Sequence, residues 1–198
     1  MRSLIALILM TVMVRAGAAD DARAADHQAL QALLVTMTTA LNEQKLDEVA
    51  KHLDQDFSLT FVDQVVVSDV AGLKTYFARW LGPDSTLASV RFAPKVERPA
   101  IFFAGDTAFA SGISEDVHTL KDGRGGVMPV RWTATVTKRG EAWKVVTLHV
   151  GISLLDNPVL TMAKDAAKQG ALIAGLVAGV VGMALGALLM LTLRRKPA

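Results

Sequence analysis

Histidine titrates nearest to neutral pH, and it is therefore the side chain best suited to acid–base chemistry or to a switchable hydrogen bond. The chain contains His27, His52, His118 and His149. They form no H-x-H or H-E-x-x-H pair, so their spacing predicts no metal site. His149 lies in the last expected strand, where it is either a ligand-pocket donor and acid–base group or a hydrogen-bonded structural residue. His118 sits beside two acidic residues near the end of an expected hairpin and is a second pocket candidate.

Three aspartates, Asp54, Asp56 and Asp63, lie close together in the sequence. In a pocket, Asp56 or Asp63 could act with His149 as a carboxylate–histidine pair. Turn and capping roles explain the same residues, because aspartate hydrogen-bonds nearby backbone N–H groups. The chain has no Cys, which excludes thiolate nucleophiles and sulfur ligands. With no serine triad, phosphate loop or dinucleotide fingerprint, the sequence predicts no catalytic residue and no cofactor.

Charge also limits the class of partner. The formal net charge is +2, from 21 Lys and Arg against 19 Asp and Glu. Five of the basic residues lie in the two end segments, namely Arg2, Arg15, Arg194, Arg195 and Lys196. The part between them has a net charge of −3. A mildly acidic domain has no electrostatic reason to bind nucleic acid, so no such partner is expected.

The elements that must position these residues follow from hydrophobic spacing. The first part reads as helix, helix, strand pair and helix. Apolar residues three and four apart predict an amphipathic first helix with Asp26 as its N-cap, and Ser68 or Asp69 is expected to cap the third. The predicted bounds are 26–41, 46–53, 57–67 and 70–81, in that order.

The next part, 87–152, is rich in β-branched and aromatic residues. Three turn signals divide it, at 104–106, 121–126 and 139–141, and they predict an antiparallel meander. Strict alternation in the last strand would place Trp143, Val145, Thr147 and His149 on one face of the sheet. In the strand before it, Trp132 is a core, interface or ligand-pocket residue.

Four short motifs agree with this order of elements. They are 40–47 (ALNEQKLD), 53–57 (LDQDF), 70–77 (VAGLKTYF) and 143–150 (WKVVTLHV). Each resembles a segment found at the same place in SnoaL-like and DUF4440-type domains of the NTF2-like superfamily. The resemblance covers about Asp26–Leu155. It implies an α+β cone, in which three N-terminal helices pack on a curved antiparallel sheet.

This superfamily includes isomerases, cyclases, dehydratases and many ligand-binding or oligomerisation modules, so function must be argued from the site. Ketosteroid isomerase needs a tyrosine on the first helix and an aspartate near the first strand. The corresponding positions here are Met37 and Phe61, which cannot do that chemistry. His149 corresponds to the family's last-strand histidine.

The two ends of the chain have the patterns of membrane targeting. Residues 1–19 predict a signal peptide: Arg2, an apolar run over 4–14, and small residues after it. The alternative is an uncleaved anchor. Residues 171–193 carry no charge and are long enough to cross a bilayer as a helix. A linker over 156–170 precedes this span, and the basic tail 194–198 is expected to stay in the cytoplasm.

Together these patterns predict a domain on the periplasmic side of the inner membrane, held by one span. Gly175 and Gly179, and likewise Gly182 and Gly186, are four residues apart, a spacing that favours helix association. The chain is expected to be a homodimer that binds a small apolar ligand or acts as an accessory module. One alternative is a pocket enzyme of isomerase or dehydratase type using His149. The other is a structural subunit of a membrane complex.

Overall fold

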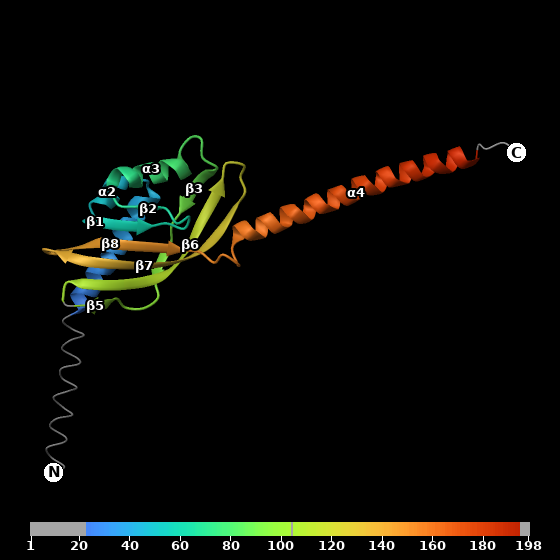
Figure 1. Cartoon of the computed structure of the whole chain (residues 1–198). Helices are drawn as coiled ribbons and strands as arrows, with labels where there is room; N and C mark the ends of the chain where they lie inside the picture. Colours follow the sequence, from blue (N-terminus) through green and yellow to red (C-terminus); the bar gives the residue numbers. More distant parts are fainter. Residues whose placement is uncertain (1–22, 104, 195–198) are drawn as a thin grey trace, which may run out of the picture. The chain divides into compact units, whose positions relative to one another are not determined.

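The structure is a computed structural model that describes residues 23–103 and 105–194 (Figure 1). It divides into two units between Ser153 and Leu154, and each is described by itself. The predicted signal peptide, 1–19, lies outside the described residues, as does 195–198 of the predicted tail.

Three helical segments occur in the first unit: residues 23–42, α2 (Leu46–Ala50) and α3 (Val70–Leu81). Asp69 caps α3, because its carboxylate accepts a hydrogen bond from the Gly72 N–H at 2.7 Å. The predicted cap at Asp26 is wrong, because the first helix already includes residue 23. The second helix is shorter than predicted, because Leu53 is already part of the first strand.

Eight strands form one curled sheet in the first unit. The path through it is β2-β1-β8-β7-β6-β3, and β4 and β5 also pair with β6. The strands are β1 Leu53–Thr60, β2 Val66–Val67, β3 Leu87–Arg91, β4 Pro94–Val96, β5 Ile101–Phe103, β6 Thr107–Leu120, β7 Gly125–Arg139 and β8 Ala142–Gly151.

The three predicted hairpins are confirmed, since β5–β6, β6–β7 and β7–β8 all pair antiparallel. The sheet is nevertheless mixed, because β1 and β8 run parallel. Parallel neighbours need a crossover connection, and the long segment that contains α3 supplies it. The prediction of a wholly antiparallel sheet is therefore wrong at this pair.

A bulge in β8 changes which side chains share a face. Thr135 pairs with Thr147 and Val136 with Val145, so Val146 is an extra residue on β8. Trp143 and Val145 are buried in the core, and Leu148 packs against the same core. The predicted grouping of Trp143 and Val145 with Thr147 and His149 is therefore wrong, because alternation restarts after the bulge.

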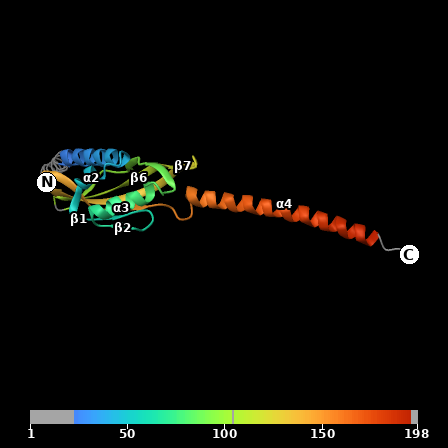
Figure 2. The same cartoon turned by 90° about the horizontal axis from the view of Figure 1, so that it is seen from above.

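The helices and the sheet enclose one hydrophobic core. Leu30, Leu33, Met37 and Leu41 of the first helix pack against buried residues from α3 and strands β1, β6, β7 and β8. Figure 2 shows helix 23–42 along one side of the sheet. We call the side of the sheet that contacts this core the helix-covered face and the opposite side the open face.

Asp26 fastens the first helix to the sheet instead of capping it. Its carboxylate pairs with Lys138 Nζ at 3.0 Å and accepts a hydrogen bond from Trp143 Nε1 at 3.2 Å. Arg23 pairs with the same carboxylate at 3.1 Å and donates to the Gly105 carbonyl at 2.8 Å. The hydrogen bond from Lys138 is the main cause that lowers the pKa of Asp26.

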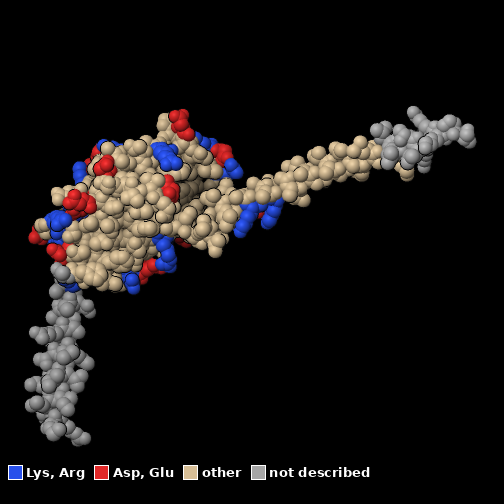
Figure 3. Space-filling model, viewed as in Figure 1, with Lys and Arg blue, Asp and Glu red and all other residues tan. Residues whose placement is uncertain are grey.

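The second unit contains the helix α4, Pro158–Arg194. It runs without interruption through the predicted linker and the predicted span. By length and composition, its segment Pro158–Gly186 is apolar enough to cross a membrane. Figure 3 shows charged side chains near the start of α4 and uncharged ones along the described part that follows. In the sequence, the first part of α4 carries the charged residues Lys164, Asp165 and Lys168.

Candidate functional site

The helix-covered face holds two of the four predicted pocket residues. Trp132 is buried on β7, and His118 is half-buried on β6. The pairing of β6 and β7 is continuous, so side chains at every second position of β6 share the face of the fully buried Ala108. This rule places Gly112, Ser114, Asp116 and His118 in one row on that face.

Ser114, Asp116 and His118 form a group that we call the inner polar cluster. Ser114 Oγ donates a short hydrogen bond to Asp116 Oδ1. The Ala93 N–H donates to Ser114 Oγ at 3.2 Å and to Asp116 Oδ1 at 3.3 Å. His118 Nδ1 lies 3.1 Å from the Asp116 carbonyl oxygen. The residues present a carboxyl, a hydroxyl and an imidazole on one side of the sheet.

Burial dominates the chemistry of Asp116. Its residue is 6% exposed and makes no ion pair among the residues that the structure describes. Burial raises the pKa of this carboxyl, although Ser114 and the Ala93 N–H oppose the shift. Burial thus makes this carboxyl easier to protonate than an exposed aspartate.

Four aromatic rings connect α3 with the neighbourhood of this cluster. Phe61 stacks on Tyr76 with ring centroids 3.9 Å apart, and Tyr76 and Phe77 are 5.8 Å apart. Phe77 meets Phe92 at 6.3 Å, and Phe92 directly precedes Ala93, whose N–H bonds the cluster. We call Phe61, Tyr76, Phe77 and Phe92 the aromatic wall.

Asp63, the third predicted pocket residue, lies at the turn between β1 and β2. It is exposed and accepts a hydrogen bond from the Tyr76 hydroxyl at 3.3 Å. Burial, followed by the nearby Asp63 charge, raises the pKa of Tyr76. Asp63 also stabilises the turn, because its Oδ1 accepts a hydrogen bond from the Val65 N–H at 3.3 Å. The structure thus joins Asp63 to the aromatic wall.

His149, the fourth, lies on the open face. It pairs with Thr60 on one side and Thr133 on the other, and its side chain is exposed. Thr135 and Thr147 pair two residues further along, on the same face. The structure therefore separates His149 from Trp132 and His118, which lie across the sheet.

Gly112 explains the position of the Trp132 ring. A Cβ added to Gly112 would lie 2.6 Å from Trp132 Cζ2 and would clash with the Lys95 carbonyl oxygen. Trp132 Nε1 donates to the Ile113 carbonyl at 3.2 Å. The indole can lie over the β6 backbone only because residue 112 has no side chain.

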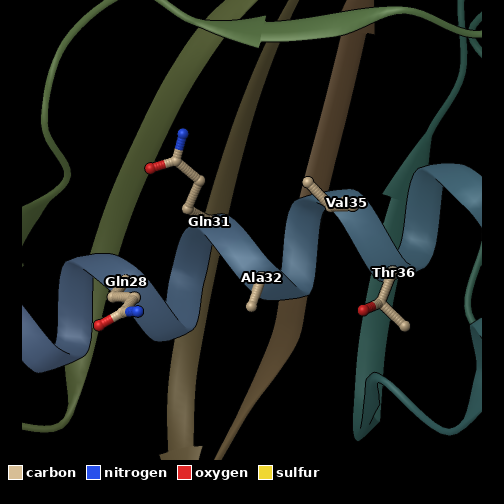
Figure 4. Close-up of a pocket in the computed structure, with 5 residues that line it drawn as sticks. All are labelled: Gln28, Gln31, Ala32, Val35 and Thr36. Carbon is tan, nitrogen blue, oxygen red and sulfur yellow. The ribbon is translucent and has the colours of Figure 1, made fainter.

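Two shallow hollows lie away from the four predicted pocket residues, and the second includes Asp54. One is on the first helix and is lined by Gln28, Gln31, Ala32, Val35 and Thr36 (Figure 4). The other is lined by Leu53, Asp54, Gln55, Arg139 and Lys144. In the second, Arg139 Nε bonds the buried Asp54 carboxylate at 2.7 Å, and this bond lowers the pKa of Asp54. No polar cluster comparable to Ser114, Asp116 and His118 lines either hollow.

Asp116, Ser114 and Tyr76 are the site residues that the sequence reasoning missed. Polar residues at alternate positions in a long strand were the available signal in β6. Within the described part of the chain, no group of three or more His, Asp or Glu side chains is placed to hold a metal ion.

The most informative comparisons are with solved structures, since no protein-family model and no curated protein matches the chain. One is a putative scytalone dehydratase from Novosphingobium aromaticivorans, 13% identical, covering 68% of this chain and 88% of that one, with a TM-score of 0.59. A type 2 hexachlorocyclohexane dehydrochlorinase is 15% identical, covering 68% and 89%, with a TM-score of 0.58.

A third structure carries the fold name in its description. It is an NTF2-like protein of unknown function from Pseudomonas putida, 14% identical, covering 64% of this chain and 86% of that one, with a TM-score of 0.50. Identities this low show a shared fold and not a shared activity. The chain therefore has the NTF2-like fold.

Proposed function

We propose that this chain is a membrane-anchored ligand-binding protein, whose NTF2-like domain holds a small, neutral and largely apolar molecule against the helix-covered face. The observation that carries the proposal is Asp116, a buried carboxyl that forms no ion pair with any residue in the described ranges. Burying a carboxyl without a counter-ion costs free energy, and a titratable group with a pKa shifted by burial is a candidate for a functional role. The aromatic wall supplies the apolar surface that such a ligand needs.

The neutral character of the ligand follows from the same residues. A cationic ligand would suit an ionised carboxylate, but burial favours the protonated form of Asp116. An anionic ligand would meet the Asp116 carboxyl, and no Lys or Arg among the described residues bonds the cluster. A molecule with an aromatic body and a hydroxyl or carbonyl oxygen fits both the wall and the cluster.

The test uses the neutral probe 2-naphthol and the full-length protein in nanodiscs. Equilibrium dialysis against empty nanodiscs of the same lipid gives the protein-dependent binding. Met128 pairs with Asp116 and is half-buried on the same face, so Met128→Trp adds bulk beside the cluster. Thr133→Trp adds the same bulk to the open face and is the matched control.

The proposal expects saturable binding to the wild type and to Thr133→Trp, with loss in Met128→Trp. Equal binding to both variants would place the probe elsewhere. If the wild type shows no saturable binding, the proposed ligand-binding function is wrong.

We further propose that the domain faces the periplasm and that α4 anchors it in the inner membrane. The support is the length and apolar composition of Pro158–Gly186, the signal-like pattern of residues 1–19 and the basic tail. A cysteine introduced at the exposed position Thr133 gives the test. An impermeant thiol reagent should label it in cells with a permeable outer membrane and an intact inner membrane. Labelling only after cell lysis would mean that the domain faces the cytoplasm.

The second candidate function is an elimination reaction, with His118 removing a proton. It rests on the position of His118 beside Asp116 and on the likeness to a dehydratase and a dehydrochlorinase. Chloride release from hexachlorocyclohexane provides an assay. Turnover by the wild type that is lost in His118→Gln would favour this candidate over simple binding. His149 is not part of it, because its side chain lies on the open face.

A further inference from the structure

Arg139, at the end of β7, is held in place by a buried carboxylate. Its Nε donates to Asp54 Oδ2 at 2.7 Å, and its Nη2 donates to Asp54 Oδ1 at 3.3 Å. The Asp54 side chain is 2% exposed, whereas the Arg139 side chain is 60% exposed. A guanidinium has five N–H donors, so the Nη1 donors and one Nη2 donor of Arg139 stay unbonded within the described ranges.

The free donors of Arg139 lie on the outer edge of the guanidinium, formed by Nη1 and Nη2. In another ion pair, Arg131 uses this edge, with Nη1 at 2.8 Å and Nη2 at 3.2 Å from the Glu97 carboxylate oxygens. Arg139 bonds Asp54 through the edge that contains Nε instead. Its outer edge can therefore still bind a carboxylate, because two parallel N–H groups match the two carboxylate oxygens.

Lys144, near the start of β8, supplies a second cation. It is half-buried, and its Nζ donates to the Lys51 carbonyl oxygen. Among the residues that the structure describes, Lys144 forms no ion pair. Burial, followed by the charge of Lys144, lowers the pKa of the nearby His52. The ammonium group is thus fixed by a carbonyl and left without a counter-ion.

Both cations line one hollow of about 410 Å³. Its lining consists of Leu53, Asp54, Gln55, Arg139 and Lys144. Asp54 is the one carboxylate in this lining and already pairs with Arg139, so the lining has one positive charge in excess. The volume lies within the range of small-molecule sites, about 300–1,000 Å³. Leu53 adds an apolar side chain for the carbon part of a ligand.

We propose that this hollow binds the carboxylate group of a small organic acid, with the outer edge of Arg139 and the Lys144 ammonium as its two cationic contacts. The bond to Asp54 orients the guanidinium before a ligand arrives, so less conformational freedom is lost on binding. An ion pair that merely joins β7 to β1 would explain Arg139 but not the unpaired Lys144 beside it.

This site is separate from the inner polar cluster. Arg139 ends β7, whereas Met128, the partner of Asp116, lies near the start of that strand. The inference therefore does not depend on the ligand-binding function proposed above, and each can fail without the other.

The experiment compares benzoate with benzamide, a neutral molecule of nearly the same shape. Equilibrium dialysis measures binding to the full-length protein in phosphatidylcholine nanodiscs against empty nanodiscs. Lys144→Gln removes one cation without touching the Asp54 pair, and Arg139→Lys keeps a charge for Asp54 but removes the outer edge. Arg124→Lys is the matched control, because Arg124 also bonds an aspartate, Asp122, through Nε but does not line the hollow.

The wild type and Arg124→Lys are expected to bind benzoate saturably and benzamide not at all. Lys144→Gln and Arg139→Lys should each weaken benzoate binding about tenfold, because each removes a charged hydrogen-bond donor. Cyclohexanecarboxylate should displace benzoate, whereas inorganic phosphate and 2-naphthol at the same concentration should not.

Four results would overturn the inference. Equal benzoate binding to Lys144→Gln and Arg124→Lys would exclude the hollow, even if Arg139→Lys does not fold. Phosphate that displaces benzoate more readily than cyclohexanecarboxylate would exclude a carboxylate as the preferred ligand. Displacement by 2-naphthol would mean that benzoate occupies the site beside Asp116. If the wild type does not bind benzoate saturably, the inference fails while the 2-naphthol site stands.

Discussion

Asp116 illustrates how one residue can set the character of a site. Its carboxyl accepts from Ser114 and from the Ala93 N–H, and no Lys or Arg among the described residues pairs with it, so that besides these two bonds only His118 opposes the effect of burial. Burial raises its pKa from the ordinary value of 3.8. The folded protein therefore binds the proton of Asp116 more strongly than the unfolded chain does.

This raised pKa gives a pH dependence with a definite sign. Stability falls as pH rises through the unfolded pKa toward the folded pKa, because the folded state is then forced to ionise a buried group. Asp116→Asn, which cannot ionise, should have a higher Tm than the wild type at pH 7. The difference should shrink below about pH 4. Thermal melts of both proteins between pH 3 and 8 measure it, and a difference independent of pH would contradict the assignment.

Gly112 lies where the surrounding atoms leave no room for a side chain. Gly112→Ala would drive a methyl group into the Trp132 ring and the Lys95 carbonyl, at a cost of about 1–3 kcal/mol or more in the free energy of unfolding. Gly126→Ala on β7 is the matched control, because a Cβ there meets nothing within 4 Å. Chemical denaturation compares the two. Equal stabilities would mean that Trp132 does not lie over Gly112.

At the scale of elements, Asn42 connects the end of the first helix to the corner between β3 and β4. Its side-chain amide donates to the Phe92 carbonyl at 3.0 Å, and its oxygen accepts from the Phe92 N–H at 2.7 Å. The next residue, Ala93, donates to the inner polar cluster. One side chain on the helix thus positions the backbone that holds Asp116.

Asn42→Ala should lower the free energy of unfolding by about 1–2 kcal/mol, since it removes both hydrogen bonds to the backbone of Phe92. Asn42→Asp keeps the acceptor and loses the donor, so an intermediate loss is expected. Denaturant melts give the stabilities, and binding of 2-naphthol should weaken in the same order. A loss of stability without any effect on binding would show that this corner does not support the site.

The sequence predicts much of this architecture, and its failures have local causes. The capped helix 70–81 and the three hairpins are confirmed, because caps, turns and periodicity are short-range signals. The alternation of side chains along the sequence gives no sign of the bulge at Val146. Because of this bulge, Trp143 and His149 lie on opposite faces of the sheet and not on the same face as predicted. The strands β1 and β8 are separated by a crossover of more than eighty residues, and no local sequence pattern predicts that they pair.

The candidate site was less predictable than the fold. Trp132 and His118 do lie on the helix-covered face, but His149 lies across the sheet and Asp63 at a turn. Asp116 was noticed in the sequence only as a neighbour of His118. Its burial depends on the partner strands β7 and β3 and on the Ala93 backbone, which come from distant parts of the chain.

At the scale of the whole molecule, α4 is the element on which the proposed membrane anchor depends. Its described apolar side chains are exposed: Leu176, for example, is 71% exposed and Met183 is 71% exposed. Surfaces of this kind are stable in lipid and not in water.

A chain that ends at Asp156 should therefore remain in the soluble fraction, whereas the full-length protein should stay with the membrane after washing with alkaline carbonate. Fractionation followed by immunoblotting shows both. A full-length protein that the carbonate wash releases would mean that α4 does not span the bilayer.

The central claim is that the ligand lies against the helix-covered face beside Asp116, and the contact of a bound probe with Met128 tests it most directly. The measurement is a nuclear Overhauser effect between the Met128 ε-methyl group and the ring protons of 2-naphthol, with Met128→Leu to assign the methyl signal. The account predicts a strong effect that disappears when excess unlabelled ligand of the same shape displaces the probe. Saturable binding with contacts only to the methyl groups of Thr133 and Thr147, on the open face, would contradict it.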